Sequence, residues 1–181
     1  MASLTARLGG VFELSALALF LTVSAAAQPL PDFSGRWIAV PEPAATGGGN
    51  LAAGPLGSGW GNEVTLTQNA TTLTVERAQF SAYDMQPPMR FSYALDGSEN
   101  RITLNVGRGA QEMVVRTSQQ DDSLVITTSY HVSLPDDGRP ATVEMKQVLS
   151  LDAPGSLVVT TTLTGLKSGT SSKSTTRYKR A

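Results

Sequence analysis

Glu63-Val-Thr-Leu-Thr-Gln-Asn-Ala-Thr-Thr-Leu-Thr-Val-Glu-Arg77 is the stretch that predicts the fold, because apolar and polar residues alternate on both sides of one turn sequence. Alternation with a period of two is typical of β-strands that bury one face. Asn69-Ala70 lies between the two runs and begins with a residue type that favours tight turns. Val64 and Leu66 can then pair with the apolar residues of the second run. The stretch therefore predicts a β-hairpin.

Comparable runs continue to the C-terminus, and helical spacing of apolar residues is absent. The turn sequences between them are Asp96-Gly97, Asp121-Asp122, Pro135-Asp136-Asp137-Gly138 and Ala153-Pro154-Gly155. Across Asp96-Gly97 we expect a hairpin in which Phe91, Tyr93 and Leu95 face Ile102, Leu104 and Val106. The other expected inward residues are Met113, Val115, Leu124, Ile126, Thr128, Tyr130, Val143, Met145, Leu149, Leu151, Leu157, Val159 and Leu163.

Adding segments 33–40 and 175–179 gives about nine or ten strands, and their short connections favour neighbouring strands that follow one another in sequence. A meander of this length would leave two exposed edges unless it curled round and closed. The expected fold is therefore all-β, an antiparallel up-and-down meander of about nine or ten strands closed into a barrel.

The first residues have the pattern of an export signal. Arg7 precedes an apolar run from Val11 to Val23, and Ala25-Ala26-Ala27 supplies the small residues that a signal peptidase requires. The run is too short to cross an apolar layer of about 30 Å as a helix, so no membrane anchor is expected. We expect residues 1–27 to be a signal peptide and residues 28–181 to be a single domain.

Composition narrows the compartment and the partners. The formal net charge of −1 provides no field that would attract nucleic acid, so no nucleic-acid partner is expected. The chain has no cysteine, which excludes disulfides and thiolate metal sites. Export without disulfides favours a bacterial periplasm or the extracellular medium. The sequence identifies no protein partner.

The stretch Asp32-Phe-Ser-Gly-Arg-Trp37 opens the expected domain. Gly35 allows the chain to bend tightly at the entry to a strand, so that the Trp37 indole can swing beneath the barrel and close one end. A cationic side chain from the last strand can then stack on the indole face. Arg177 is the cation that we expect there.

This Gly-x-Trp opening, followed by a β-meander and a late arginine, resembles the lipocalins and the wider calycin group of small up-and-down barrels. The residues that carry the resemblance are Gly35, Trp37 and Arg177. The opening is also similar to a set of uncharacterised exported bacterial proteins that begin with Asp-Phe-Ser-Gly-x-Trp. The resemblance implies a lipocalin-like barrel, and it leaves open haem binding through a single histidine, as in some calycin-like barrels.

No group of residues in the sequence predicts catalysis. His131 is the only histidine, and its place in the alternation directs it to the outer face as a solvated imidazole. The pairs Asp121-Asp122 and Asp136-Asp137 lie in predicted turns, where Asp bonds its own backbone. No serine has the surroundings of a nucleophile. We expect no catalytic residue, no cofactor and no metal, with haem at His131 as the alternative.

The expected inner face mixes aliphatic and aromatic residues with polar ones, among them Gln68, Thr128 and Thr161. An unpaired buried polar group costs about 1–3 kcal/mol, so a sealed core would not ordinarily contain them. We therefore expect the barrel to bind a small hydrophobic or amphipathic molecule. The expected ligand-binding residues are Arg77, Phe91, Tyr93, Tyr130, Met145 and Gln147.

A second interpretation is a structural or protein-interaction domain with a filled core and no ligand. Its interaction surface would be either the Gly-, Pro- and Ala-rich segment 41–61 or a Thr-rich outer face. Segments 41–61 and 79–88 both interrupt the alternation, and either could lie over a mouth of the barrel.

Overall fold

The structure is a computed structural model that describes residues 29–41, 60–80, 85–106, 109–133, 140–165 and 171–181. Within these ranges the elements are ten β-strands, so the expected all-β class is confirmed. Their bounds are β1 Gly35–Ala39, β2 Glu63–Gln68, β3 Thr72–Phe80, β4 Met85–Ala94, β5 Asn100–Val106, β6 Gly109–Gln120, β7 Ser123–Ser133, β8 Pro140–Ala153, β9 Ser156–Thr164 and β10 Ser171–Arg180.

Several sequence expectations fall outside the described residues. They include the signal peptide and nearly all of segment 41–61. The segment 79–88 is described in part, and there β3 and β4 continue into the expected break as far as Phe80 and from Met85. Among the described residues, no helix has the length and apolar character needed to cross a membrane.

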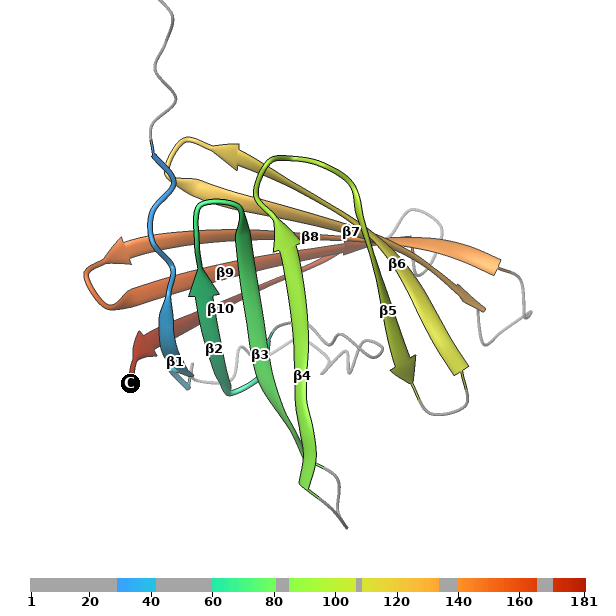
Figure 1. Ribbon diagram of the computed structural model, residues 1–181, viewed down its shortest axis with the longest axis horizontal. Helices are drawn as coiled ribbons and strands as arrows, with labels where there is room; N and C mark the ends of the chain where they lie inside the picture. Colours follow the sequence, from blue (N-terminus) through green and yellow to red (C-terminus); the bar gives the residue numbers. More distant parts are fainter. Residues whose placement is uncertain (1–28, 42–59, 81–84, 107–108, 134–139, 166–170) are drawn as a thin grey trace, which may run out of the picture.

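All ten strands belong to one antiparallel sheet in the order β4-β3-β2-β1-β10-β9-β8-β7-β6-β5. The first strand pairs with the last, with Trp37 opposite Arg180 and Ala39 opposite Tyr178. This pairing bends the meander round into a nearly closed barrel, with β4 and β5 as its two free edges. In Figure 1, β1 to β4 form one wall, and β8 to β10 form a second wall that crosses it steeply.

The up-and-down order places successive connections at opposite ends of the barrel. The turns between β2 and β3, β4 and β5, β6 and β7, and β8 and β9 share one end with residues 29–34 and the C-terminus. We call this the turn end. The remaining strand ends form the opposite end of the barrel.

The predicted hairpin across Asp96-Gly97 is wrong. β4 and β5 are consecutive in sequence, yet they stand at opposite ends of the strand order and are not paired. Side chains take the place of the ladder here, because Asn100 donates to the Ser92 carbonyl oxygen and Thr117 donates to that of Ala94. These carbonyls are therefore occupied by side-chain donors instead of backbone amides of β5.

Most of the other residues expected on the inner face are buried, Leu95, Ile102 and Leu151 are partly buried, and the side chain of Val106 lies outside the described residues. The hairpin of β2 and β3 pairs Leu66 with Val75 and Gln68 with Leu73. The inward residues of both walls belong to a single hydrophobic cluster that runs from Phe33 to Tyr178. Burial of this cluster is the main stabilising contribution available to a chain without disulfides.

The Gly-x-Trp opening closes the turn end through direct contacts. Trp37 is fully buried, and its Nε1 donates to the Phe33 carbonyl oxygen at 2.9 Å. The guanidinium of Arg180 lies 4.8 Å from the indole centroid. Gly35 has a φ of +146°, and a Cβ at this position would lie 3.2 Å from Nη1 of Arg180. The backbone conformation favours glycine here, and a larger residue would also require the Arg180 guanidinium to move by a few tenths of an ångström.

The expectation that Arg177 stacks on Trp37 is therefore corrected to Arg180. Tyr178 is buried on the inner face, and residues two apart share a face, so Arg180 lies on the same row at the end of β10, opposite Trp37. Arg177 lies on the outer face and forms an ion pair with Asp152.

The residues before β1 form a strap across the turn end. The Gln68 side chain accepts from the Phe33 amide at 3.1 Å and donates to the Pro31 carbonyl oxygen at 3.0 Å. The Gln68 amide in turn donates to the Ser34 hydroxyl at 3.0 Å. Gln68, which was expected only as an inward polar residue, is thus a clamp for the strap.

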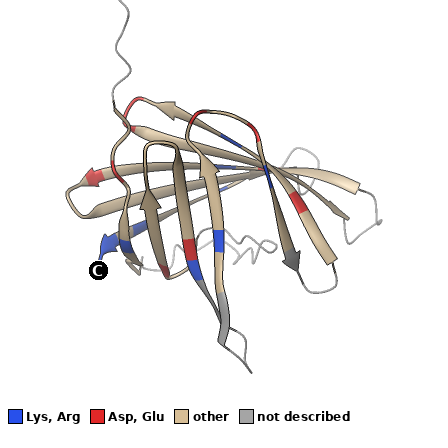
Figure 2. Cartoon of the chain, in the orientation of Figure 1, with Lys and Arg blue, Asp and Glu red and all other residues tan. Residues whose placement is uncertain are grey.

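Charged residues of both signs are interspersed along the strands (Figure 2). Cross-strand ion pairs join Arg36 to Glu63 at 2.7 Å and Arg116 to Glu99 at 2.7 Å, and another joins Arg90 to Glu76. These pairs are largely exposed and contribute little to stability.

We expect Arg180→Ala to lower the free energy of unfolding by about 0.5–2 kcal/mol, because it removes the cation over a buried indole. Arg177→Ala is the matched control and should change that free energy by less than about 0.5 kcal/mol. Urea unfolding followed by tryptophan fluorescence measures both. Equal losses in the two variants would contradict the assignment of Arg180 as the stacking cation.

Candidate functional site

The candidate site is the inner face of the barrel, where a row of polar side chains crosses three strands. Gln147 of β8 lies opposite Thr161 of β9, which lies opposite Ser174 of β10. We call these three residues the polar row. Gln147 and Thr161 are each 2% exposed, although glutamine and threonine are mostly exposed in folded proteins.

Two atoms of the polar row are buried without a hydrogen-bond partner. They are Oε1 of Gln147 and Oγ1 of Thr161, which belong to directly opposed residues. The large majority of buried polar side-chain atoms in proteins have a hydrogen-bond partner, so two neighbouring atoms without one need an explanation. A bound group that offers hydrogen bonds to both atoms would satisfy them.

An aromatic and cationic cluster lies on the wall formed by β3 and β4. The rings of Phe91 and Tyr93 are nearly parallel, with centroids 6.4 Å apart. The Arg77 guanidinium lies 5.9 Å from the Phe91 centroid, and its Nη2 lies 3.3 Å from the sulfur of Met89. A cation thus faces the interior against an apolar surface.

Burial shifts the pKa values in this cluster. It lowers the pKa of Arg77, and the neighbouring Tyr93 and Tyr178 hydroxyls partly offset that effect. Arg77 remains charged at neutral pH, since guanidinium begins from a very high pKa. Burial raises the pKa of Tyr178 to about 12, and it raises the pKa of Tyr93 further.

The expected ligand-binding residues divide between the two walls. Arg77, Phe91 and Tyr93 belong to the β3–β4 cluster, whereas Tyr130, Met145 and Gln147 belong to β7 and β8. Five of the six are buried, and Arg77 is half-buried. The structure adds Tyr178 beside Arg77 and identifies Thr161 as the partner of Gln147 across the strands. The alternation through β10 would have indicated Tyr178, because it lies on the inner row.

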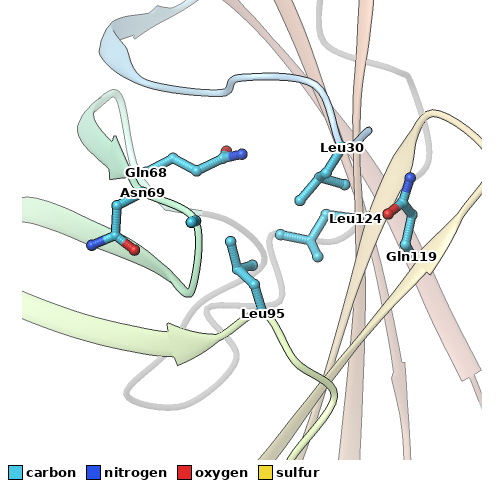
Figure 3. Close-up of a pocket in the computed structure, with 7 residues that line it drawn as sticks. Leu30, Gln68, Asn69, Leu95, Gln119 and Leu124 are labelled. Carbon is cyan, nitrogen blue, oxygen red and sulfur yellow. The ribbon is translucent and has the colours of Figure 1, made fainter. Parts of the chain in front are cut away.

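A pocket of about 280 Å³ opens at the turn end. Figure 3 shows Leu30, Leu95 and Leu124 directed toward one another, with amide side chains around them. Those amides already hold the backbone in place: Gln68 clamps the strap, and the Gln119 side chain donates to the Asp121 carbonyl oxygen. This pocket therefore offers apolar contact but less polar recognition than the polar row does.

His131 lies on the exposed outer face, where its Nδ1 is 3.1 Å from the Thr142 hydroxyl. In the part of the chain that the structure describes, acidic and histidine side chains form no group of three that could hold a metal ion.

Fold and inner face together define a class of protein, a small nearly closed antiparallel barrel with a mixed apolar and polar interior. Comparison with known proteins adds no closer assignment: no protein-family model matches the chain, and no match was found among curated proteins or solved structures.

We expect Thr161→Val to raise the free energy of unfolding of the ligand-free protein by about 1 kcal/mol, because it removes an unpaired buried hydroxyl. Thr117→Val should lower it by about the same amount, because the Thr117 hydroxyl is bonded to the Ala94 carbonyl oxygen. Denaturant unfolding of both variants measures the contrast. A loss of stability in Thr161→Val would show that its hydroxyl is already satisfied.

Stability should also fall as the pH rises above about 10. The unfolded state releases its tyrosine protons near pH 10, whereas the folded state retains that of Tyr178 until about pH 12. Folding is therefore disfavoured between these values, by at most about 1.4 kcal/mol per pH unit for each such tyrosine. Tyr93→Phe should flatten the decline more than Tyr130→Phe, because burial raises the pKa of Tyr93 more than that of Tyr130. Thermal unfolding across this range provides the measurement.

Proposed function

We propose that the protein is an exported, lipocalin-like binding module for a small apolar or amphipathic molecule, which it holds inside the barrel without catalysis. The observation that carries the proposal is the pair of unpartnered buried atoms on Gln147 and Thr161. An apolar pair of similar shape would be more stable in an empty core, so retaining the polar pair is understandable if a ligand bonds to it.

The two walls suggest how such a ligand would be oriented. Met145 and Leu163 flank the polar row on β8 and β9 and provide apolar contact beside it. Phe91 and Tyr93 provide flat aromatic surface on the other wall, with Arg77 at its edge. The polar row suits a hydroxyl, amide or protonated carboxyl group, since these both donate and accept hydrogen bonds. Arg77 would favour an anionic group.

Location outside the cytoplasm belongs to the same proposal. The leader pattern in residues 1–27 and the absence of cysteine suit a bacterial periplasm or the extracellular medium. A binding module in that space would meet the hydrophobic molecules of the cell envelope.

The test is native mass spectrometry of the purified protein after incubation with cell-envelope lipid extract. We expect the wild type to retain a discrete additional mass. Thr161→Val should lose most of it, because the ligand then lacks one polar partner, although the variant itself is expected to be more stable. Loss of binding together with a gain in stability would separate a ligand contact from a folding role.

Thr160→Val is the matched control, because Thr160 precedes Thr161 on the same strand and its hydroxyl lies 3.2 Å from that of Thr175 on the outer face. It should retain the additional mass. If the wild type acquires no mass from the extract, the protein is instead a structural or protein-interaction domain with a filled core.

A further inference from the structure

The barrel has one longitudinal seam, between the free edges of β4 and β5. In Figure 1 these two strands diverge from their connection at the turn end. At every other position around the barrel, adjacent strands are paired in an antiparallel ladder, with local register shifts in the β3–β4 and β8–β9 pairs. The wall is therefore interrupted at a single place within the described residues.

Two side-chain hydrogen bonds join the wall across the seam. Nδ2 of Asn100 donates to the Ser92 carbonyl oxygen at 3.1 Å, and the Thr117 hydroxyl donates to the Ala94 carbonyl oxygen. The other amide atom of Asn100, Oδ1, is buried without a hydrogen-bond partner. On the outside, the exposed ion pair between Arg116 and Glu99 connects β6 to the β4–β5 connection. Bonds of this kind contribute less than a ladder and open more readily.

Addition of a partner's strand is disfavoured at this edge. Ser92 and Ala94 present their carbonyls to the seam, where side chains already occupy them. Further along the same strand, Pro88 lacks an amide hydrogen, and Arg90 carries a charge paired with Glu76. Proline and charge are the devices by which edge strands resist pairing with another chain.

The seam is connected to the candidate site by the register of the sheet. Thr117 of β6 lies opposite Ile126, which lies opposite Gln147, which lies opposite Thr161. One continuous row thus leads from a seam hydrogen bond to the polar row, and all four of these side chains are buried. A molecule that passed between β4 and β5 beside Thr117 would therefore enter the barrel at the level of the polar row.

We propose that the β4–β5 seam is the entry route for small molecules into the barrel, and that Asn100 and Thr117 are the residues that hold it closed. The inference that a natural ligand enters through the seam rests on the proposed binding function. Its opening is a property of the protein alone and can be measured without that ligand.

The absence of native cysteine allows a single interior probe. In Thr161→Cys, the new thiol occupies a position that is 2% exposed, so a small thiol reagent reaches it only when the barrel opens. We expect labelling with a rate that depends only weakly on urea, because local opening exposes little surface, whereas global unfolding gives a steep dependence.

Adding Thr117→Val or Asn100→Ala to this background should accelerate labelling about fivefold to tenfold, the effect expected from losing one hydrogen bond. Asn100→Ala also removes the unpartnered Oδ1, which offsets part of the stability lost with the hydrogen bond. This variant therefore keeps the test available if Thr117→Val does not fold. Val64→Ala, on the core side of β2 and two strands away from β4, is the control for general destabilisation and should leave the rate at low urea unchanged.

Two results would overturn the seam as entry route: labelling that follows global unfolding at all urea concentrations, or equal acceleration by Val64→Ala and the seam variants. Failure of the binding proposal is a different result, since it appears as the absence of a retained mass in the lipid experiment while thiol labelling through the seam persists.

Discussion

The pairing of β1 with β10 is the constraint on which the rest of the structure depends. A meander of ten strands could remain an open sheet, and only the junction of its first and last strands turns it into a barrel with an interior. β1 is short, so the junction needs support beyond its ladder. Trp37 between the Phe33 carbonyl and the Arg180 guanidinium provides that support. Gly35 provides the space in which the guanidinium lies.

Most of the fold follows from local sequence, because alternation and turn residues act over a few positions. The strands, their inward faces and the β2–β3 hairpin could be predicted in this way. The seam could not, since the sequence between Leu95 and Glu99 resembles an ordinary hairpin turn. Whether β4 and β5 pair is decided by closure elsewhere and by two side chains, one of which, Thr117, comes from β6.

Local alternation also decides which residues of the candidate site could be predicted from the sequence. The inward direction of Gln147 and Arg77 follows from alternation, and the structure agrees. The cation over Trp37 was misassigned to Arg177 because the last strand contains more than one arginine, and the alternation around Tyr178 favours Arg180. That Gln147 and Thr161 oppose each other depends on the register of β8 and β9, which sequence patterns do not determine.

The strand order explains both why the barrel closes between β1 and β10 and why its wall lacks a backbone ladder between β4 and β5. Each strand of the barrel has two edges, and pairing β1 with β10 satisfies both edges of both strands. The two strand edges left without a backbone partner are then those where the sheet ends, on β4 and β5. Because side chains close that place, it can separate without breaking a backbone ladder. A barrel of this kind can therefore be stable as a whole while one part of its wall opens.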